Sequence, residues 1–442
     1  MVALLHRRIA YAVAAIVFVT VVFLSRDVAT EHVKNINWNT STDFLRKGSE
    51  NKENDKPKVP EPYDIHNPYN DSAETANIPE TSNQNKIDTQ ASNNDNSINS
   101  IKNATFGFEH IFVVGLPSRS DRRDGMALGA GLTGVQIEFI DGIAGSDITE
   151  KAIILPQEGK AIEGGSLGAW RAHINAIREV VMRNLTTALI MEDDIDWDVR
   201  IKRQLRDFAL SSRALLQPLR DSDGYADPSY PYKTAKSPKK TVNLKFSELP
   251  PTKDPITTPY GDKWDAFWLG NCGMAFPDDK NAFISRGRVT YENDETVPAK
   301  KFMDKANLPQ LLEQYPDHTR VVHHSQGGIC SLAYAVTQRG AQKMLYELAL
   351  KPVTRPFDLM LNAFCGGDLG GEDHNCLAVS PPIFNHHRPA GNMNSESDIS
   401  PHGENYRAEP MTDLVRWAVR VNAAKLLRGE QNFVDAFPDD KE

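Results

Sequence analysis

The amino-acid sequence predicts an α/β fold in which helices flank a mostly parallel β-sheet, behind an N-terminal membrane anchor. Between residues 109 and 216, short apolar runs alternate with longer segments whose apolar residues recur at helical spacing. A single uncharged apolar run lies close to the N-terminus. The 442 residues include 59 acidic and 50 basic side chains, a formal charge of −9. This balance lacks the basic excess of a nucleic-acid-binding protein, so no nucleic-acid partner is expected.

The N-terminal segment is predicted to fix the chain to a membrane. Residues 9–24 carry no charge, follow the basic residues 6–8, and lack a small-residue cleavage site behind them. We therefore expect a cytosolic tail at 1–8 and a signal-anchor helix at 9–25. The run is short for a membrane span, which suits the thinner Golgi or ER membrane and a single-pass type II orientation. A cleaved signal peptide is the alternative.

The remaining chain divides by composition. Residues 26–104 are rich in Asn, Asp, Glu, Lys and Ser, and they hold too few large apolar residues to offset the entropy of ordering, so they are predicted to be a disordered stem. A folded domain is expected over 105–400, with a loop excursion at 218–262, and a helical tail over 401–442. Glycosylation sequons that fit exposure to a lumen begin at Asn39, Asn70, Asn103 and Asn184.

Each element of the folded domain is predicted from a local pattern. Apolar runs bounded by turn residues predict strands at 109–116, 135–140, 186–191, 264–276 and 332–337. Apolar residues at helical spacing predict helices at 166–182, 199–216, 338–348 and 411–427. Because strand and helix alternate, the strands are expected to lie mainly parallel, with ligands bound beyond their carboxyl ends.

Charged residues follow two of these strands. Arg119 and Arg122 come after the first strand, where they could pair with a phosphate or form a solvated basic turn. Four acidic residues follow the third strand, where they could bind Mn²⁺ or Mg²⁺ or cap the next helix. They are Glu192, Asp193, Asp194 and Asp196.

A glycine-dense loop and four cysteines complete the candidate features. Glu372 and Asp373 lie in the loop at 366–374, where they are available for catalysis or belong to a solvated turn. The cysteines allow two bridges in three connectivities in an oxidising lumen, and we expect at least one; four reduced thiols are the alternative. They are Cys272, Cys330, Cys365 and Cys376.

Several motifs, in order, resemble glycosyltransferase family 25, the group that contains bacterial lipooligosaccharide and animal collagen galactosyltransferases. They are IFVVGLPSRSDRR, GSLGAWRAHINAI, ALIMEDDID, CSLAYAVTQRGAQKML and RPFDLML. His173 matches the second motif, but Ala172 stands where the family usually has Ser, and the excursion at 218–262 looks more like fungal secretory members.

The resemblance implies a GT-A fold, a UDP-sugar donor, typically UDP-galactose, and an inverting mechanism. We therefore expect Asp194, with Glu192, at the metal, where Asp196 could help although it lies just past the motif. Arg122, which stands at the family's arginine position, is expected at the donor, together with Arg119, Glu192, Asp193 and His173. His173 could equally be a hydrogen-bonded structural residue. The base would be Asp358, with Glu372 and Asp373 as alternatives from the glycine-dense loop.

The predicted function is thus transfer of a hexose, most simply galactose, to a hydroxyl of a glycan or glycoprotein in the Golgi or ER lumen. Two other classes stay open. A non-catalytic lumenal scaffold could keep the same fold. A metal-dependent phosphoesterase could use the same acidic cluster, although the histidines show no recognisable spacing for two metals.

Overall fold

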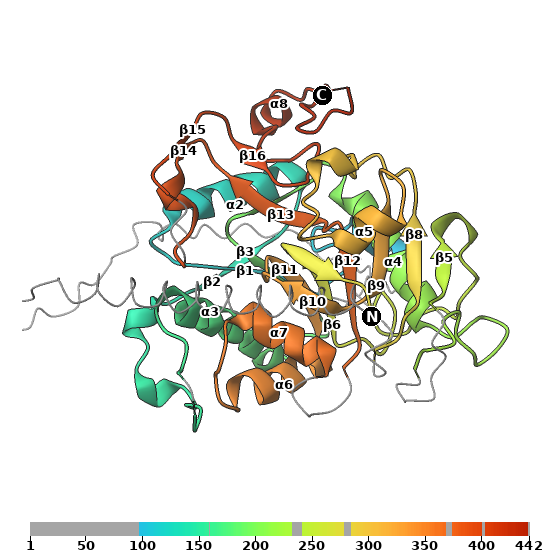
Figure 1. Cartoon of the computed structure of the whole chain (residues 1–442), viewed down its shortest axis with the longest axis horizontal. Coiled ribbons are helices and arrows are strands. Elements are labelled where there is room, and N and C mark those ends of the chain that lie inside the picture. The colour runs from blue at the N-terminus through green and yellow to red at the C-terminus, as the bar shows by residue number, and fades with distance from the viewer. Residues whose placement is uncertain are drawn as a thin grey trace, which may run out of the picture. The chain divides into compact units, whose positions relative to one another are not determined.

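A nine-stranded β-sheet forms the centre of the fold (Figure 1). The computed structural model describes residues 97–158, 160–231, 241–277, 284–367, 374–399 and 403–440. In order across the sheet, the strands are β2 (Glu138–Asp141), β1 (His110–Gly115), β3 (Thr187–Glu192), β11 (Ala333–Thr337), β6 (Ala266–Gly270), β12 (Cys376–Ser380), β9 (Arg320–His324), β8 (Arg288–Tyr291) and β5 (Asn243–Lys245).

The sheet is mixed but mostly parallel in strand direction. The pairs β1–β2, β1–β3, β6–β12 and β5–β8 are parallel, whereas β11 and β9 run antiparallel to both of their neighbours. Seven of the nine strands therefore point the same way. The carboxyl ends of β1 and β3 consequently lie at one edge, as the sequence predicts.

Helices cover both faces of this sheet. On one face lie α3 (Gly164–Met182), α6 (Gln338–Met344) and α7 (Phe357–Gly366), and on the other lie α2 (Ser120–Thr133) and α4 (Ile201–Leu216) (Figure 1). Alternate residues of β1 point to opposite faces of the sheet. Phe112 packs in the core on the α3 side, and Val113 packs in the core on the α2 side. The result is a three-layer α/β/α arrangement.

A smaller three-stranded sheet stands next to the edge where β3 ends. It consists of β4 (Ile195–Trp197), β13 (Phe384–Arg388) and β16 (Met411–Thr412), with β13 in the middle. Further short elements surround it and the main sheet: β7 (Gly273–Ala275), β10 (Gln326–Ile329), β14 (Gly391–Asn392), β15 (Tyr406–Arg407), α5 (Pro309–Gln314) and α8 (Ala423–Leu427).

The C-terminal segment differs from the predicted helix over 411–427. Only α8 is an α-helix there; Met411–Thr412 form β16 and pair with β13, and Ala418 pairs with Asp198 just after β4. The amide of Val419 donates to the carbonyl of Trp197 at 2.9 Å, and the Thr412 hydroxyl donates to Asp196 at 3.0 Å. These tertiary hydrogen bonds satisfy the segment's polar groups, so they override its amphipathic pattern.

Two other predictions need adjustment. The predicted strand at 264–276 is broken into β6 and β7 by a turn at Asn271 and Cys272. The excursion at 218–262 contributes an edge strand, β5, to the main sheet. The expected disulfides are confirmed, as Cys272 bonds to Cys330 and Cys365 bonds to Cys376.

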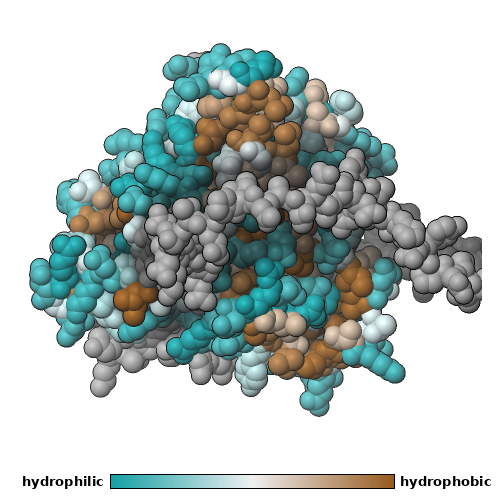
Figure 2. Space-filling view, turned by 180° about the vertical axis from the view of Figure 1, so that it is seen from behind, coloured by the Kyte–Doolittle hydropathy of each residue, from teal (hydrophilic) through white to brown (hydrophobic). Residues whose placement is uncertain are grey.

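The predicted tail, anchor and most of the predicted stem lie outside the described residues. Within the described ranges, no helix is both long and apolar enough to span a bilayer. Seen from behind, the surface is largely hydrophilic and is interrupted by separate apolar patches (Figure 2).

Candidate active site

A cavity of about 1150 Å³ opens at the carboxyl ends of β1 and β3. On one side it is bordered by backbone of residues 142–146 and 164–168, and glycines let these two segments approach closely. A Cβ on Gly145 would lie 1.8 Å from the carbonyl oxygen of Gly164, so no larger residue fits there without movement. We call these two segments, together with Gly115, the glycine side of the cavity.

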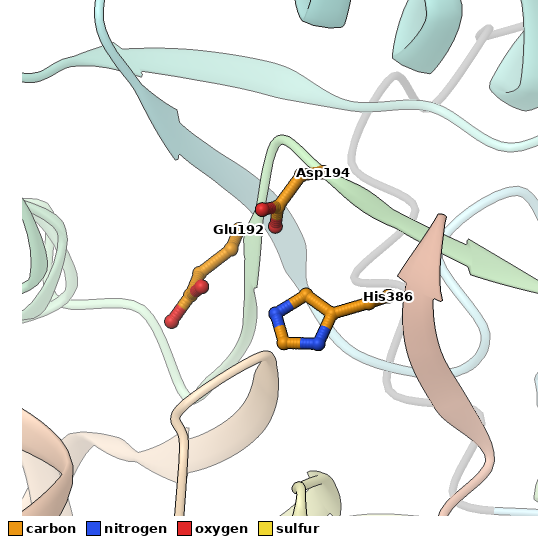
Figure 3. Close-up of side chains that lie close together, drawn as sticks. All are labelled: Glu192, Asp194 and His386. Atoms are coloured by element: carbon orange, nitrogen blue, oxygen red, sulfur yellow. The ribbon is translucent and has the colours of Figure 1, made fainter. Parts of the chain in front are cut away.

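Three candidate metal ligands converge in this cavity. Glu192 ends β3, Asp194 lies in the following turn, and His386 comes from β13. The pairing of Ile195 with His386 between β4 and β13 brings the histidine to the turn. One ligand atom of each lies within 4.8 Å of the others, and the imidazole faces the two carboxylates across a gap (Figure 3).

The surroundings of Asp194 favour a bound cation. Its Oδ1 is buried and has no hydrogen-bond partner among the described residues. Burial by itself raises the pKa of Asp194, but His386, Arg122, Arg388 and Arg420 together hold that pKa below its ordinary value. An ionised oxygen that is buried and unpaired is a group that a divalent ion would satisfy.

Asp193 borders the cavity, but its side chain is packed against β1. Its Oδ2 occupies the space where a Cβ on Gly115 would sit, 1.9 Å away, and has no partner among the described residues. Burial, reinforced by Asp194, raises the pKa of Asp193 to about 7, although Arg122 opposes the rise. Asp193 is therefore placed to pack and to pair with Arg122, not to join the three candidate ligands.

Asp196 lies apart from the candidate metal ligands. It is fully buried beneath β13 and is not part of the cavity wall. Its carboxylate accepts hydrogen bonds from Thr412 and from the backbone amides of Trp197 and Arg420. Burial raises its pKa to about 6 despite these bonds. In the structure Asp196 thus fastens the C-terminal segment and lies outside the group of three candidate metal ligands.

A buried hydrogen-bond chain positions Glu192. Ser331 donates to Glu192 Oε1 at 2.8 Å, and His173 Nε2 lies 3.2 Å from the Ser331 oxygen. Tyr334 lies 3.3 Å from His173 Nδ1, and the His173 ring stacks on Phe357 at 4.3 Å. His173 borders the cavity, but both of its ring nitrogens face these protein partners. Of its two predicted roles, the geometry favours the structural one.

The two predicted donor-binding arginines are occupied by carboxylates. Arg119 pairs with Asp121 at 2.8 Å and with Asp398 at 2.5 Å, and these contacts raise its pKa. Arg122 pairs with Asp193 at 3.0 Å and Asp194 at 3.4 Å, which raise its pKa although burial lowers it. Only Arg122 borders the cavity. The guanidinium of Arg122 offsets the negative charge of the acidic turn. It therefore leaves few N–H groups to donate hydrogen bonds to a nucleotide.

Asp358 borders the cavity at the start of α7, as expected for a candidate base. One oxygen accepts from the amide of Cys330 at 2.9 Å and the other from the amide of Leu359 at 2.8 Å. Cys330 is bonded to Cys272, whose sulfur lies 3.9 Å from His386 Nδ1. The disulfide therefore links the position of Asp358 to that of the candidate metal ligands. The alternative bases, Glu372 and Asp373, lie outside the described residues.

Sequence reasoning missed His386 as a ligand. His386 lies 192 positions after Asp194, and this spacing gives no sign in the sequence that the two side chains meet. The usable signal is structural, because the β4–β13 pairing alone brings the two together.

Comparison with known proteins identifies the family of the chain. The family model described as glycosyltransferase family 25 (LPS biosynthesis protein) matches residues 108–361, more than half of the chain. The chain therefore belongs to glycosyltransferase family 25.

Similarity to individual curated relatives is confined to a short segment. The chain is 30% identical over 112 residues to procollagen galactosyltransferase 1-B of Xenopus laevis, and 28% identical over 111 residues to procollagen galactosyltransferase 1 of Danio rerio. It is 27% identical over 110 residues to the human protein named inactive glycosyltransferase 25 family member 3. These matches cover 22%, 23% and 22% of this chain and 18% of each relative.

Proposed function

We propose that the protein is an inverting, metal-assisted glycosyltransferase that moves a hexose, most simply galactose, from a UDP-sugar to a hydroxyl of a glycan or glycoprotein. We place it in the Golgi or ER membrane as a single-pass type II protein, with its folded domain in the lumen. The observation that carries the proposal is the convergence of Glu192, Asp194 and His386 in a large cavity of a family 25 fold. The two disulfides suit an oxidising lumen.

The three candidate metal ligands, Glu192, Asp194 and His386, favour Mn²⁺ over Mg²⁺. Two carboxylates suit either ion, whereas an imidazole moves the preference from the strictly oxygen-binding Mg²⁺ toward a transition metal. The unpaired Oδ1 of Asp194 supplies a buried ligand atom. A metal held by these residues would offset the negative charge of the departing diphosphate.

The protein's own residues account for the other requirements of the reaction. Ser331 and His173 hold Glu192 toward the cavity, and Arg122 helps to keep Asp194 ionised without occupying His386. The glycine side exposes backbone that a flat nucleotide base can approach closely. Asp358, fixed by two backbone amides, borders the same cavity on the α7 side.

Calorimetric titration of UDP into the full chain, with and without Mn²⁺, tests this proposal. We expect Mn²⁺-dependent UDP binding that Asp194→Ala removes, because the substitution deletes a ligand oxygen. Asp124→Ala is the matched control, since Asp124 is an exposed residue of α2 and does not border the cavity. A screen of UDP-sugars for Mn²⁺-dependent hydrolysis then identifies the donor.

Each outcome of the titration is informative. Binding that survives in Asp194→Ala would remove the assigned metal site. Absence of UDP binding in folded protein would overturn the proposal and favour a non-catalytic role, such as the name of the human inactive relative suggests for that protein. Release of phosphate from simple phosphate esters, without sugar transfer, would favour a phosphoesterase.

A further inference from the structure

The cavity has a second side that none of the predicted site residues occupies. It is built by the segment around Lys300–Phe302 and by the C-terminal segment, and it contains Phe302, Leu308, Asp413, Leu414 and Phe437. We call these five residues the aromatic wall. The rings of Phe302 and Phe437 pack edge to face at 5.4 Å, and Leu414 packs against the small core that includes Leu308. The wall is therefore fixed by its own packing while remaining partly exposed to the cavity.

Asp413 is the polar group of this wall. Its amide donates to the carbonyl of His386 at 3.0 Å, so it lies beside the candidate metal ligands. In the described ranges its carboxylate makes no hydrogen bond or ion pair, although it borders the cavity.

The other carboxylates that border the cavity all have partners. Arginines, Ser331 or backbone amides engage each of them. They are Glu192, Asp193, Asp194, Asp304, Asp358, Glu396 and Asp398. Among the described carboxylates that border the cavity, Asp413 is thus the one for which neither oxygen is engaged by a protein group, so it can accept a hydrogen bond from a bound molecule.

The charge around the wall disfavours a phosphate group. Two nearby lysine ammonium groups already donate to backbone carbonyls: Lys301, which lies 5.1 Å from the centre of the Phe302 ring, donates to Asp439, and Lys300 donates to Leu312. The cations that border the cavity are Arg122 and Arg388, and both donate to the carbonyl of Glu396, away from the wall. No lysine or arginine belongs to the wall itself, whereas Asp413 would repel an anion. A neutral ligand with hydroxyl groups fits better, since apolar ring faces pack against C–H groups and a carboxylate accepts from hydroxyls.

We propose that the aromatic wall binds a neutral sugar ring of the acceptor, with Phe302 and Phe437 packing against the sugar and Asp413 accepting a hydrogen bond from one of its hydroxyls. This inference specifies the acceptor of the proposed function. It depends on that function only in identifying the bound sugar as the acceptor. The proposed ligand is a carbohydrate. The competing ligand is a peptide hydroxyl that carries no sugar.

The test compares three variants of the full chain: Phe437→Ala, Asp413→Asn and Asp304→Asn. The last is the matched control, because Asp304 borders the cavity but its carboxylate caps its own turn by accepting from the amide of Ala306. Saturation-transfer NMR measures binding of the methyl glycosides of galactose, glucose and mannose, and calorimetry measures UDP with Mn²⁺. For a glycoside that serves as acceptor, steady-state assays give its KM.

We expect at least one glycoside to bind the wild type. Asp413→Asn should weaken that binding, and raise the KM, by about 10- to 100-fold, as for loss of a hydrogen bond to a charged group. Phe437→Ala should weaken it about tenfold. UDP binding should change by less than about twofold in both, and Asp304→Asn should resemble the wild type.

Three results would overturn the inference. One is glycoside binding that both variants retain. Another is UDP affinity that falls in parallel with glycoside affinity, which would assign the wall to the donor. The third is transfer to serine or threonine peptides with no glycoside binding. Since the NMR measurement needs no turnover, failure of UDP binding alone would sink the proposed function and leave the sugar site standing.

Discussion

The glycine side and the aromatic wall face the same cavity but are built differently. The glycine side comes from segments that directly follow β1 and β2 or begin α3, and its shape depends on missing side chains. The aromatic wall comes from residues 300–308 and 413–437, and its shape depends on side chains that pack on one another. A surface made of backbone, such as the glycine side, suits a donor that is shared across a family. A surface made of side chains, such as the aromatic wall, can vary with the acceptor.

The largest effect is expected from Gly145→Ala on the glycine side. The added methyl would meet the carbonyl oxygen of Gly164 at 1.8 Å, which forces the two segments apart. Because the separation reshapes the backbone surface that the donor would contact, UDP affinity should fall by about 100-fold, or about 3 kcal/mol, in a calorimetric titration.

Gly131→Ala provides the control for this experiment. A methyl at Gly131, on α2, meets open space, so UDP affinity should stay unchanged and unfolding should shift to a slightly higher temperature. Equal UDP affinities in the two variants would mean that the donor does not use the glycine side.

A second, smaller effect concerns the support of the aromatic wall. His323 packs edge-on against Phe276 at 4.6 Å, and Phe276 belongs to the small core with Leu308. Burial lowers the pKa of His323 to about 3 from its ordinary 6.5. Between these pH values the unfolded chain binds a proton that the folded chain does not, so stability must fall as pH decreases. The loss is about 1.4 kcal/mol for each pH unit below 6.5.

Urea unfolding at several pH values between 4.5 and 6.5 checks this expectation. His323→Gln removes the titrating group while keeping a polar side chain near Ser380, so its stability should depend less steeply on pH than that of the wild type. Parallel pH profiles for the two proteins would contradict the assignment.

The smallest effect is expected at Ser331, which borders the same cavity. Its hydroxyl holds Glu192 at 2.8 Å, and loss of such a supporting hydrogen bond weakens metal binding by about tenfold. Ser331→Ala should therefore lower Mn²⁺ affinity about tenfold, measured by electron paramagnetic resonance of the free ion. Ser331→Thr keeps the hydroxyl and should restore most of the affinity. If Ser331→Ala binds Mn²⁺ as the wild type does, Glu192 needs no such support.

The same contrast explains what the sequence could reveal. The acidic turn after β3 and the basic turn after β1 are local patterns, so Glu192, Asp194 and Arg122 were predicted beside the cavity and lie there. His386 and Asp413 reach it only through the pairing of β4, β13 and β16, which no local periodicity encodes. The amphipathic pattern at 411–427 predicts a helix that does not form over most of this range, because tertiary hydrogen bonds to β4 decide its conformation.

The Cys272–Cys330 bond has a practical consequence for anyone who prepares this protein. It closes a 58-residue stretch of chain, and its two ends hold Asp358 and touch His386. A chain made in a reducing cytosol would reach its fold without this disulfide, whose two cysteines border the cavity. Oxidation is then a maturation step, and preparations from the bacterial cytosol should be compared with secreted material before any lack of activity is attributed to the sequence.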